Sequence, residues 1–190
     1  MPEKEDHYIN KNLSNGEDYI AMIYYQYVDD LYSWGNTFTS QKEIIKDCIQ
    51  DLFAYLLSNP EKLGGINNLR VYLFTSFRNN LLRLLRNHRL RISERDPEED
   101  YYAEIKDPSE NIIEKLKTNE TFYNRKKEIR EILNSLSMRQ KRIIFLRYYK
   151  QMEYDEICEI LSMNYQSART LIYRLIQRMK SIYRELKLID

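Results

Sequence analysis

Residues 153–180 read Glu153-Tyr-Asp-Glu-Ile-Cys-Glu-Ile-Leu-Ser-Met-Asn-Tyr-Gln-Ser-Ala-Arg-Thr-Leu-Ile-Tyr-Arg-Leu-Ile-Gln-Arg-Met-Lys180. The pattern predicts two helices joined by a tight bend. In the first helix the apolar side chains recur at i, i+3, i+4 and i+7, which places them on one stripe. That stripe consists of Tyr154, Ile157, Cys158 and Leu161. The bend is Ser162-Met163-Asn164, where Asn164 can cap the next helix or adopt a left-handed backbone.

The second helix is expected to begin at Tyr165 and to have two distinct faces. Its buried stripe consists of Ala168, Ile172, Leu175, Met179 and Ile182. The opposite face carries amides, hydroxyls and cations, and it has no carboxylate before Glu185. Its members are Gln166, Ser167, Arg169, Thr170, Tyr173 and Gln177, with Arg174 and Arg178 beside them.

A helix with such a face suits the major groove, where amide and guanidinium groups read base edges and cations bind phosphates. The three-residue bend also fits the short turn of a helix-turn-helix. A plain helical hairpin with a solvated polar side is the alternative. An acidic first helix followed by a second one without carboxylates favours DNA binding, because solubility does not require that split.

Composition points to a soluble all-α protein. The chain has 190 residues, of which 43% are hydrophobic and 31% charged, with only four Gly and four Pro for tight strand turns. Cys48 and Cys158 each lie among apolar residues at helical positions, so we expect both to be buried small hydrophobes. His7 and His88 are too scattered for a zinc site, and no cofactor or metal is expected. No apolar run has the length of a membrane span and no signal sequence is present, which predicts a cytoplasmic protein.

Charge divides the chain into segments with different expected tasks. Residues 1–92 have a net charge of 0, residues 93–120 of −6 and residues 121–190 of +7. We therefore expect a flexible tail at 1–16, a helical domain at 17–92, an acidic linker at 93–120 and a basic helical domain at 121–190.

Three helices are expected in the first domain. One spans about residues 17–37, and a second starts near Ser40 with Glu43 completing a capping box. The core stripe of the second helix is expected to consist of Ile45, Cys48, Ile49, Leu52, Phe53 and Leu56. Its other side carries Asp47, Gln50 and Asp51, a patch that by itself would be no more than a solvated face.

A third helix is expected to follow a loop at residues 58–68, whose Pro and Gly-Gly suggest unusual backbone freedom. After its aromatic first half, it carries five arginines and no acid before residue 92. They are Arg78, Arg83, Arg86, Arg89 and Arg91. The arginine-rich part of this helix would run along the phosphates of a nucleic acid. The alternative is a solvated helix end whose cations only help to stabilise the C-terminus of the helix. In the basic domain, helices are expected through Ile129 to Leu136 and from a Ser137/Gln140 capping box.

Taken from the N-terminus, the chain has a helical domain, an acidic linker and a basic domain that ends in a helix-turn-helix. Over about residues 15–187 this arrangement resembles an extracytoplasmic-function sigma factor of the sigma-70 family. Lys46-Asp-Cys-Ile-Gln-Asp-Leu-Phe53 is similar to the family's Glu-Asp-Leu-Val-Gln-Asp-Val-Phe helix, and Tyr72-Leu-Phe-Thr-Ser-Phe-Arg-Asn79 to its Trp-Leu-…-Arg-Asn stretch. Leu136-Ser-Met-Arg-Gln-Lys-Arg and Tyr154-Asp-Glu-Ile-Cys-Glu-Ile-Leu resemble its Leu-Pro-…-Arg and Tyr-Glu-Glu-Ile-Ala-Glu-Ile-Leu.

The resemblance implies two nucleic-acid sites and one protein site in a monomeric bacterial transcription-initiation factor. Asp47, Gln50 and Asp51 would dock on the clamp of the largest subunit of core RNA polymerase. Asn68, Tyr72, Asn79 and Asn80 would contact the melted −10 element of promoter DNA, with Arg83, Arg86 and Arg89 on its backbone. The −35 element would be read by Gln166, Ser167, Arg169, Thr170, Arg174 and Arg178. An anti-sigma partner, often membrane-bound in the family, is also implied.

Three positions depart from the family pattern and concern base preference. Arg83 stands where an Asp is common, Ser162 replaces the usual Gly of the bend, and Leu171 replaces a frequent Arg of the recognition helix.

Three other classes of function remain open from the residues. One is a pure interaction scaffold, which would lack salt-sensitive affinity for DNA. A dimeric helix-turn-helix repressor or activator with an N-terminal sensor domain would bind duplex DNA alone. An enzyme has little support, because the chain has neither a Gly-rich phosphate loop nor a His-Glu-x-x-His motif. We also hypothesise that the two domains close on each other in the free protein and hide the DNA-binding faces.

Overall fold

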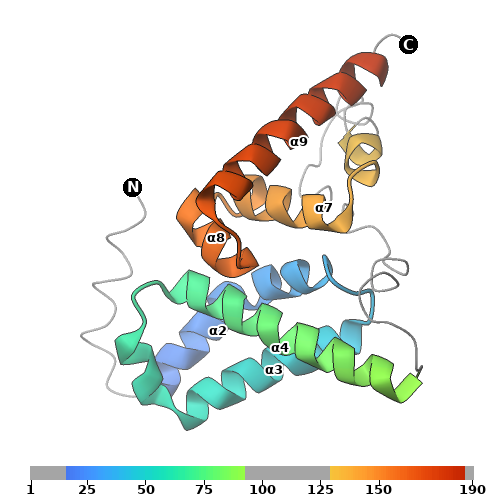
Figure 1. Ribbon diagram of the computed structural model, residues 1–190. Helices are drawn as coiled ribbons and strands as arrows, with labels where there is room; N and C mark the ends of the chain where they lie inside the picture. The colour runs from blue at the N-terminus through green and yellow to red at the C-terminus, as the bar shows by residue number, and fades with distance from the viewer. Residues whose placement is uncertain (1–15, 93–128, 187–190) are drawn as a thin grey trace, which may run out of the picture.

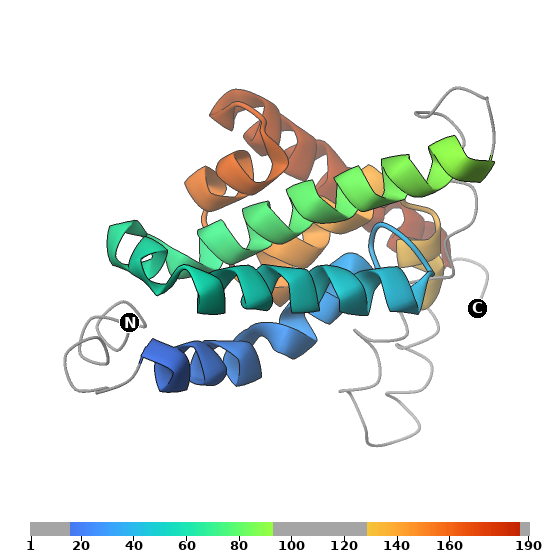
Figure 2. The ribbon, with the colours of Figure 1, turned by 90° about the horizontal axis from the view of Figure 1, so that it is seen from below.

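The computed structural model describes residues 16–92 and 129–186, which contain helices and no strand. Residues 1–15 of the expected tail, the acidic linker and residues 121–128 lie outside the described residues, and Gly16, expected in the tail, is the first residue of α2. The N-terminal domain (residues 16–92) consists of α2 (Gly16–Gly35), α3 (Lys42–Ser58), the 3₁₀ helix η1 (Pro60–Gly65) and α4 (Leu69–Ile92). In the view from below, α2, α3 and α4 lie in front of the C-terminal helices (Figure 2).

The C-terminal domain (residues 129–186) begins with a helical segment at 129–134. There follow α7 (Met138–Ile144), a π-helical turn η3 (Phe145–Tyr149), α8 (Tyr154–Leu161) and α9 (Tyr165–Leu186). Figure 1 shows these helices above the N-terminal three, with α8 closest to α4 and α9 pointing away. No helix in the described parts of the chain combines the length and the apolar character that a membrane span requires.

The α2–α3–α4 packing follows the predicted stripes. All six residues of the expected α3 stripe are buried, together with Trp34, Phe74 and Phe77 from the neighbouring helices. Gly35 lets α2 end against α3, because a Cβ at this position would lie 2.6 Å from Cγ2 of Ile45. The first helix is expected to end near residue 37, whereas α2 ends two residues earlier, at Gly35.

The predicted start of α3 is wrong. The helix begins at Lys42 with Gln41 as its N-cap, and no side chain caps it. Glu43, the expected partner of Ser40, instead pairs with Lys46 at 2.9 Å. The Thr39 hydroxyl accepts a hydrogen bond from the Gln41 N–H at 3.1 Å, so the local turn is held by the residue before the expected cap.

The segment at 58–68 is more regular than expected. Pro60 starts the 3₁₀ helix, where its missing N–H costs nothing. Among the described residues no glycine has a positive φ, so the Gly64-Gly65 pair does not use the backbone freedom that the sequence suggested.

The helix-turn-helix has the predicted bounds but a shifted core stripe. On α8, Ile157 and Ile160 are fully buried, whereas Tyr154, Cys158 and Leu161 are only half-buried. Ile160 was missed because the expected stripe assumed one packing partner, while α8 packs against both α9 and α4. Cys158 is only half-buried, so the prediction that it is a buried residue is wrong.

The bend contains both a left-handed residue and a helix cap, but at two different positions. Ser162 adopts the left-handed conformation, with φ 53° and ψ 49°. Asn164 caps α9, because its Oδ1 accepts a hydrogen bond from the Ser167 N–H at 2.8 Å. The predicted capping box of Ser137 and Gln140 at the start of α7 is confirmed.

Candidate nucleic-acid and polymerase-binding surfaces

The outer face of α9 forms the first candidate surface. Ala168, Ile172 and Leu175 are buried against the rest of the domain, which turns the opposite side of the helix outward. The predicted −35 residues Gln166, Ser167, Arg169, Arg174 and Arg178 are exposed, and Thr170 is half-buried. Donors and cations are thus presented on one side of a helix, as reading a major groove requires.

One of these arginines is already engaged within the protein. The Arg178 guanidinium donates to the Ser135 carbonyl oxygen at 3.1 Å. This contact ties α9 to the turn that follows the helical segment at 129–134, and it points to a positioning role for Arg178 beside any phosphate contact.

A groove of about 620 Å³ runs between the start of α7 and the first half of α9. Arg139 and Gln140 line it from α7, opposite Gln166 and Arg174 of α9. Arg139 is exposed, so it extends the cationic surface beyond the recognition helix. The sequence did not single it out, because only the tertiary fold brings α7 beside α9.

The second candidate surface lies on α4. Asn79, Arg83 and Arg86 are exposed, while Tyr72 and Asn80 are half-buried. Spacings of four and three residues place Asn79, Arg83 and Arg86 on one side of the helix. Arg89 belongs to α4, but its side chain lies outside the described residues.

Arg83 and the two asparagines are held by short-range contacts on α4. The Asn80 Oδ1 accepts a hydrogen bond from Arg83 Nη2 at 2.7 Å, and the Asn79 Oδ1 accepts one from Arg78 Nη1 at 3.1 Å. Since Arg83 stands where an Asp is common in the family, this face of α4 is more positive than the family pattern. A more positive face favours the phosphate backbone over base readout.

The third candidate surface lies on α3, on the side away from the core. Asp47, Gln50 and Asp51 are all exposed. Cys48, between them in sequence, points inward, and its Sγ donates to the Phe77 carbonyl oxygen at 3.5 Å. Burial raises the pKa of the Cys48 thiol to about 12, so this cysteine stays protonated near neutral pH and acts as a core residue.

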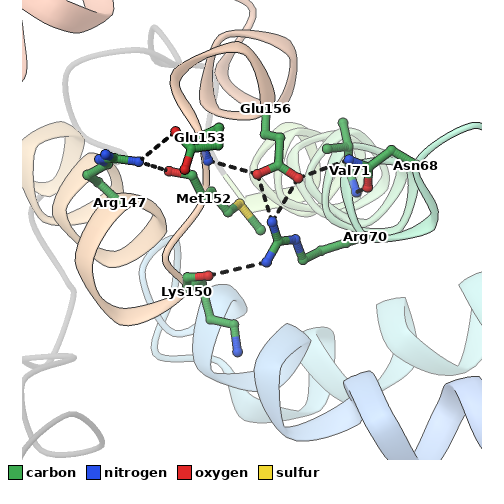
Figure 3. Close-up of polar contacts among 8 residues, drawn as sticks. All are labelled: Asn68, Arg70, Val71, Arg147, Lys150, Met152, Glu153 and Glu156. Carbon is green, nitrogen blue, oxygen red and sulfur yellow. Dashed lines mark hydrogen bonds and ion pairs between the residues drawn. The ribbon is translucent and has the colours of Figure 1, made fainter. Parts of the chain in front are cut away.

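Glu156 on α8 is the centre of polar contacts that reach the start of α4 (Figure 3). Arg70 Nη2 donates to both of its carboxylate oxygens, at 2.8 Å and 2.7 Å. Asn68 Nδ2 donates to Oε1 at 2.9 Å, and the Glu153 backbone N–H donates to Oε2 at 2.8 Å. Sequence reasoning missed this cluster, because Arg70 and Glu156 are 86 residues apart.

These contacts fix the charge state of Glu156. Burial alone would raise the pKa of its carboxyl. The hydrogen bonds from Arg70, from the Glu153 backbone and from Asn68, together with the charge of Arg70, outweigh burial and hold that pKa below its ordinary value of 4.5. Glu156 is therefore a carboxylate at neutral pH.

Asn68 is placed differently from the other predicted −10 residues. Its side chain is committed at both ends, because Oδ1 also accepts a hydrogen bond from the Val71 N–H at 3.1 Å. With its amide donating to Glu156, Asn68 joins the two domains in this structure. Asn68 is nevertheless exposed, and its contact with DNA stays a prediction.

No group of three or more His, Cys, Asp and Glu side chains within the described ranges is arranged to hold a metal ion. The three candidate surfaces carry amide groups, cations and an acidic patch, which are groups suited to binding nucleic acid or protein.

Comparisons with known proteins match both described parts of the chain. A family model described as Sigma-70 region 2 matches residues 23–91, and one described as Sigma-70, region 4 matches residues 126–179. Together they cover more than half of the chain. The RNA polymerase sigma factor YlaC of Bacillus subtilis (strain 168) is 23% identical over 158 residues, which are 83% of this chain and 87% of that protein.

The fold is similar to a solved structure as well. The sigma factor RpoE of Bartonella quintana, crystallised in complex with the anti-sigma factor NepR, superimposes with a TM-score of 0.56. The match covers 86% of this chain and 96% of that chain at 14% sequence identity.

Proposed function

The chain belongs to the sigma-70 family as an extracytoplasmic-function sigma factor with a role in promoter recognition, and we propose that its three surfaces divide this task. Asp47, Gln50 and Asp51 on α3 bind the clamp of the largest subunit of core RNA polymerase. The exposed side of α4 holds the melted −10 strand. The outer face of α9 reads the −35 element.

The observation that carries this proposal is the outer face of α9. It is exposed, it holds Arg169, Arg174 and Arg178, and it follows the acidic helix α8 through a three-residue bend. A helix with these properties can enter a major groove without repelling the phosphates on either side.

Melting of the −10 element is the second part of the proposal. Bases must leave the stack, which costs a few kcal/mol each, and contacts to the splayed bases recover about 1–3 kcal/mol per base. Tyr72, Asn79 and Asn80 supply the stacking and hydrogen-bonding groups, and Arg83, Arg86 and Arg89 supply charge for the backbone.

The remaining parts concern the cellular setting. The protein acts as a monomer in the bacterial cytoplasm, and it works by binding rather than by catalysis. An anti-sigma factor restrains it, by analogy with RpoE of Bartonella quintana, which was crystallised in complex with the anti-sigma factor NepR.

Selection of promoter sequences tests the assignment of α9. The holoenzyme is incubated with a duplex library that is randomised around the −35 position, and the bound fraction is sequenced. Arg169→Ala is expected to relax selection at one or two base pairs, a loss of about 1–3 kcal/mol of discrimination. Arg184→Ala removes another exposed cation farther along α9 and should leave the selected sequence unchanged. Equal effects of both substitutions would contradict the assignment.

A further inference from the structure

The groove between α7 and α9 lies along one flank of α9. Ser167, Leu171 and Arg174 line it from α9, and their spacings of four and three residues place them on one ridge of that helix. Arg139 lines the groove from the start of α7. Leu171 is therefore an apolar side chain between polar ones, at the border of the face that is proposed to read the −35 element.

Leu171 and Met163 make part of the groove apolar. Both line it, and both are half-buried, so each presents part of its side chain to the groove. On their inner sides they pack against the buried core, to which Ile157 and Ile172 belong. Packing against a core restricts the rotamers of a side chain. Contact with a ligand at this place therefore costs little further ordering.

The rest of the groove suits nucleic acid. Arg139 and Arg174 are exposed cations on its two sides, and no carboxylate is among the described residues that line it. Cations placed in this way bind phosphates. A strand whose phosphates they hold has the edges of its bases beside α9.

The groove is accessible although the two domains touch. Trp34 of α2, the only tryptophan of the chain, is fully buried and stacks on Phe145 of η3 with ring centroids 5.5 Å apart. Lys150 forms an ion pair with Asp30 of α2. Arg139 and the outer face of α9 are nevertheless exposed, and α9 points away from the N-terminal helices (Figure 1). The hypothesis that closure of the domains hides the DNA-binding faces is therefore wrong for α9.

Thymine is the base that an apolar group in the major groove favours. In that groove a G·C pair presents the O6 and N7 acceptors and the N4 donor, whereas thymine presents a C5-methyl group. A leucine cannot form hydrogen bonds, so it gains from covering the methyl group and loses when it covers an unpaired polar edge. An arginine at the same position would do the opposite and favour guanine.

We propose that Leu171, with Met163 in the same groove, reads the C5-methyl group of a thymine in the −35 element, and that Arg139 binds a phosphate of the strand that carries this thymine. The inference rests on the function proposed above, because it concerns the same side of α9. It assigns one position of the promoter element to thymine through an apolar contact, in addition to the polar contacts proposed for Gln166 and Arg169.

Uracil tests the contact, because it lacks only the C5-methyl group of thymine. The −35 element that the wild-type holoenzyme selects is synthesised with each thymine in turn replaced by uracil, and the apparent Kd of the holoenzyme is measured for each duplex. At the position read by Leu171 the Kd should rise roughly 3- to 5-fold, the effect of one buried methyl group. A selected element without thymine, or Kd values unchanged by every replacement, would overturn the proposal.

Leu171→Ala should bring the Kd values for uracil and thymine at that position together. Both values are measured with the same protein, so a change in overall affinity or in the folded fraction cancels in their ratio. Leu161→Ala truncates another half-buried leucine, at the end of α8 and outside the groove, and should keep the wild-type ratio. A ratio that survives in Leu171→Ala, or that disappears equally in Leu161→Ala, would overturn the role of Leu171.

Leu171→Arg should change the preference instead of removing it. Selection by this variant should replace thymine with guanine at the same position, since a guanidinium pairs with O6 and N7. A variant that still selects thymine there would contradict the contact.

Arg139→Ala should weaken binding to all duplexes by a similar factor and leave the selected sequence unchanged, as a phosphate contact requires. A changed sequence would overturn the phosphate contact. A holoenzyme that selects no −35 sequence would overturn the proposed function together with this inference. Selection that depends on Arg169 but is indifferent to uracil would overturn this inference alone.

Discussion

Among single residues, Glu156 makes the contact between the two domains sensitive to acid. Two of its partners, Arg70 and Asn68, come from the other domain, and they hold its pKa below the ordinary value. Separated domains lack these partners, so Glu156 binds the proton more readily when the domains are apart. The stabilisation of the domain contact is therefore complete above about pH 4.5 and is lost as the pH falls through the lowered pKa.

We expect the Trp34 emission of the wild type to shift to longer wavelength as the pH is lowered below about 4.5. Glu156→Gln keeps a side chain that can complete the capping box of α8, but it cannot form the ion pair with Arg70. In this variant the domains should separate more readily at neutral pH, and the change on acidification should be smaller. An acid transition of wild-type size in Glu156→Gln would contradict the role given to this carboxylate.

The left-handed backbone of Ser162, in the bend between α8 and α9, affects the stability of the protein. Its φ of 53° lies in the left-handed region, where a Cβ costs about 1 kcal/mol and glycine is favoured at helix ends. Ser162→Gly should therefore raise the free energy of unfolding slightly, by up to about 0.5 kcal/mol, since the freer unfolded chain offsets part of the gain. Ser162→Val should lower it by about 1–2 kcal/mol. Urea titration measures the free energy of unfolding of both variants. A Val variant more stable than the wild type would contradict backbone strain at position 162.

Among the helices, the contact between α2 and α3 depends on Gly35. Its missing Cβ leaves room for Ile45, so Gly35→Ala must push the two helices apart or force a side chain out of its rotamer. We expect a loss of about 1–3 kcal/mol in the free energy of unfolding. Gly64→Ala is the matched control, because no atom lies within 4 Å of a Cβ built there. Thermal melts that rank the two variants in the opposite order would contradict this packing.

Helices were predictable where periodicity decides them. The buried stripe of α3 and the two-helix unit at 153–180 could be read from apolar spacing alone. The start of α3 could not, since the helix begins at Lys42 without a side-chain cap and the expected Ser40/Glu43 capping box does not form. Ile160 was missed for a tertiary reason, because a helix that packs on two sides has a wider apolar surface than one stripe predicts.

For the molecule as a whole, the sequence predicted two helical units but not how they meet. Arg70 and Glu156 are ordinary charges on two separate amphipathic helices, and nothing in their spacing pairs them. The same holds for Trp34 and Phe145, each of which reads as an ordinary core residue. The candidate surfaces on α3 and α9 follow from helix faces, whereas the hydrogen bond between Asn68 and Glu156 follows from the domain arrangement alone.

The proposed function depends above all on the binding of core RNA polymerase through α3. Gel filtration of the purified chain with bacterial core RNA polymerase tests this binding, beside the double variant Asp47→Arg, Gln50→Ala and the control Glu61→Arg. Glu61 is an exposed acid in η1, outside the proposed α3 patch. We expect the wild type and the control to co-elute stoichiometrically with core, and the double variant to elute alone. A wild-type chain that elutes apart from core as a DNA-binding dimer would contradict polymerase binding and favour a helix-turn-helix repressor.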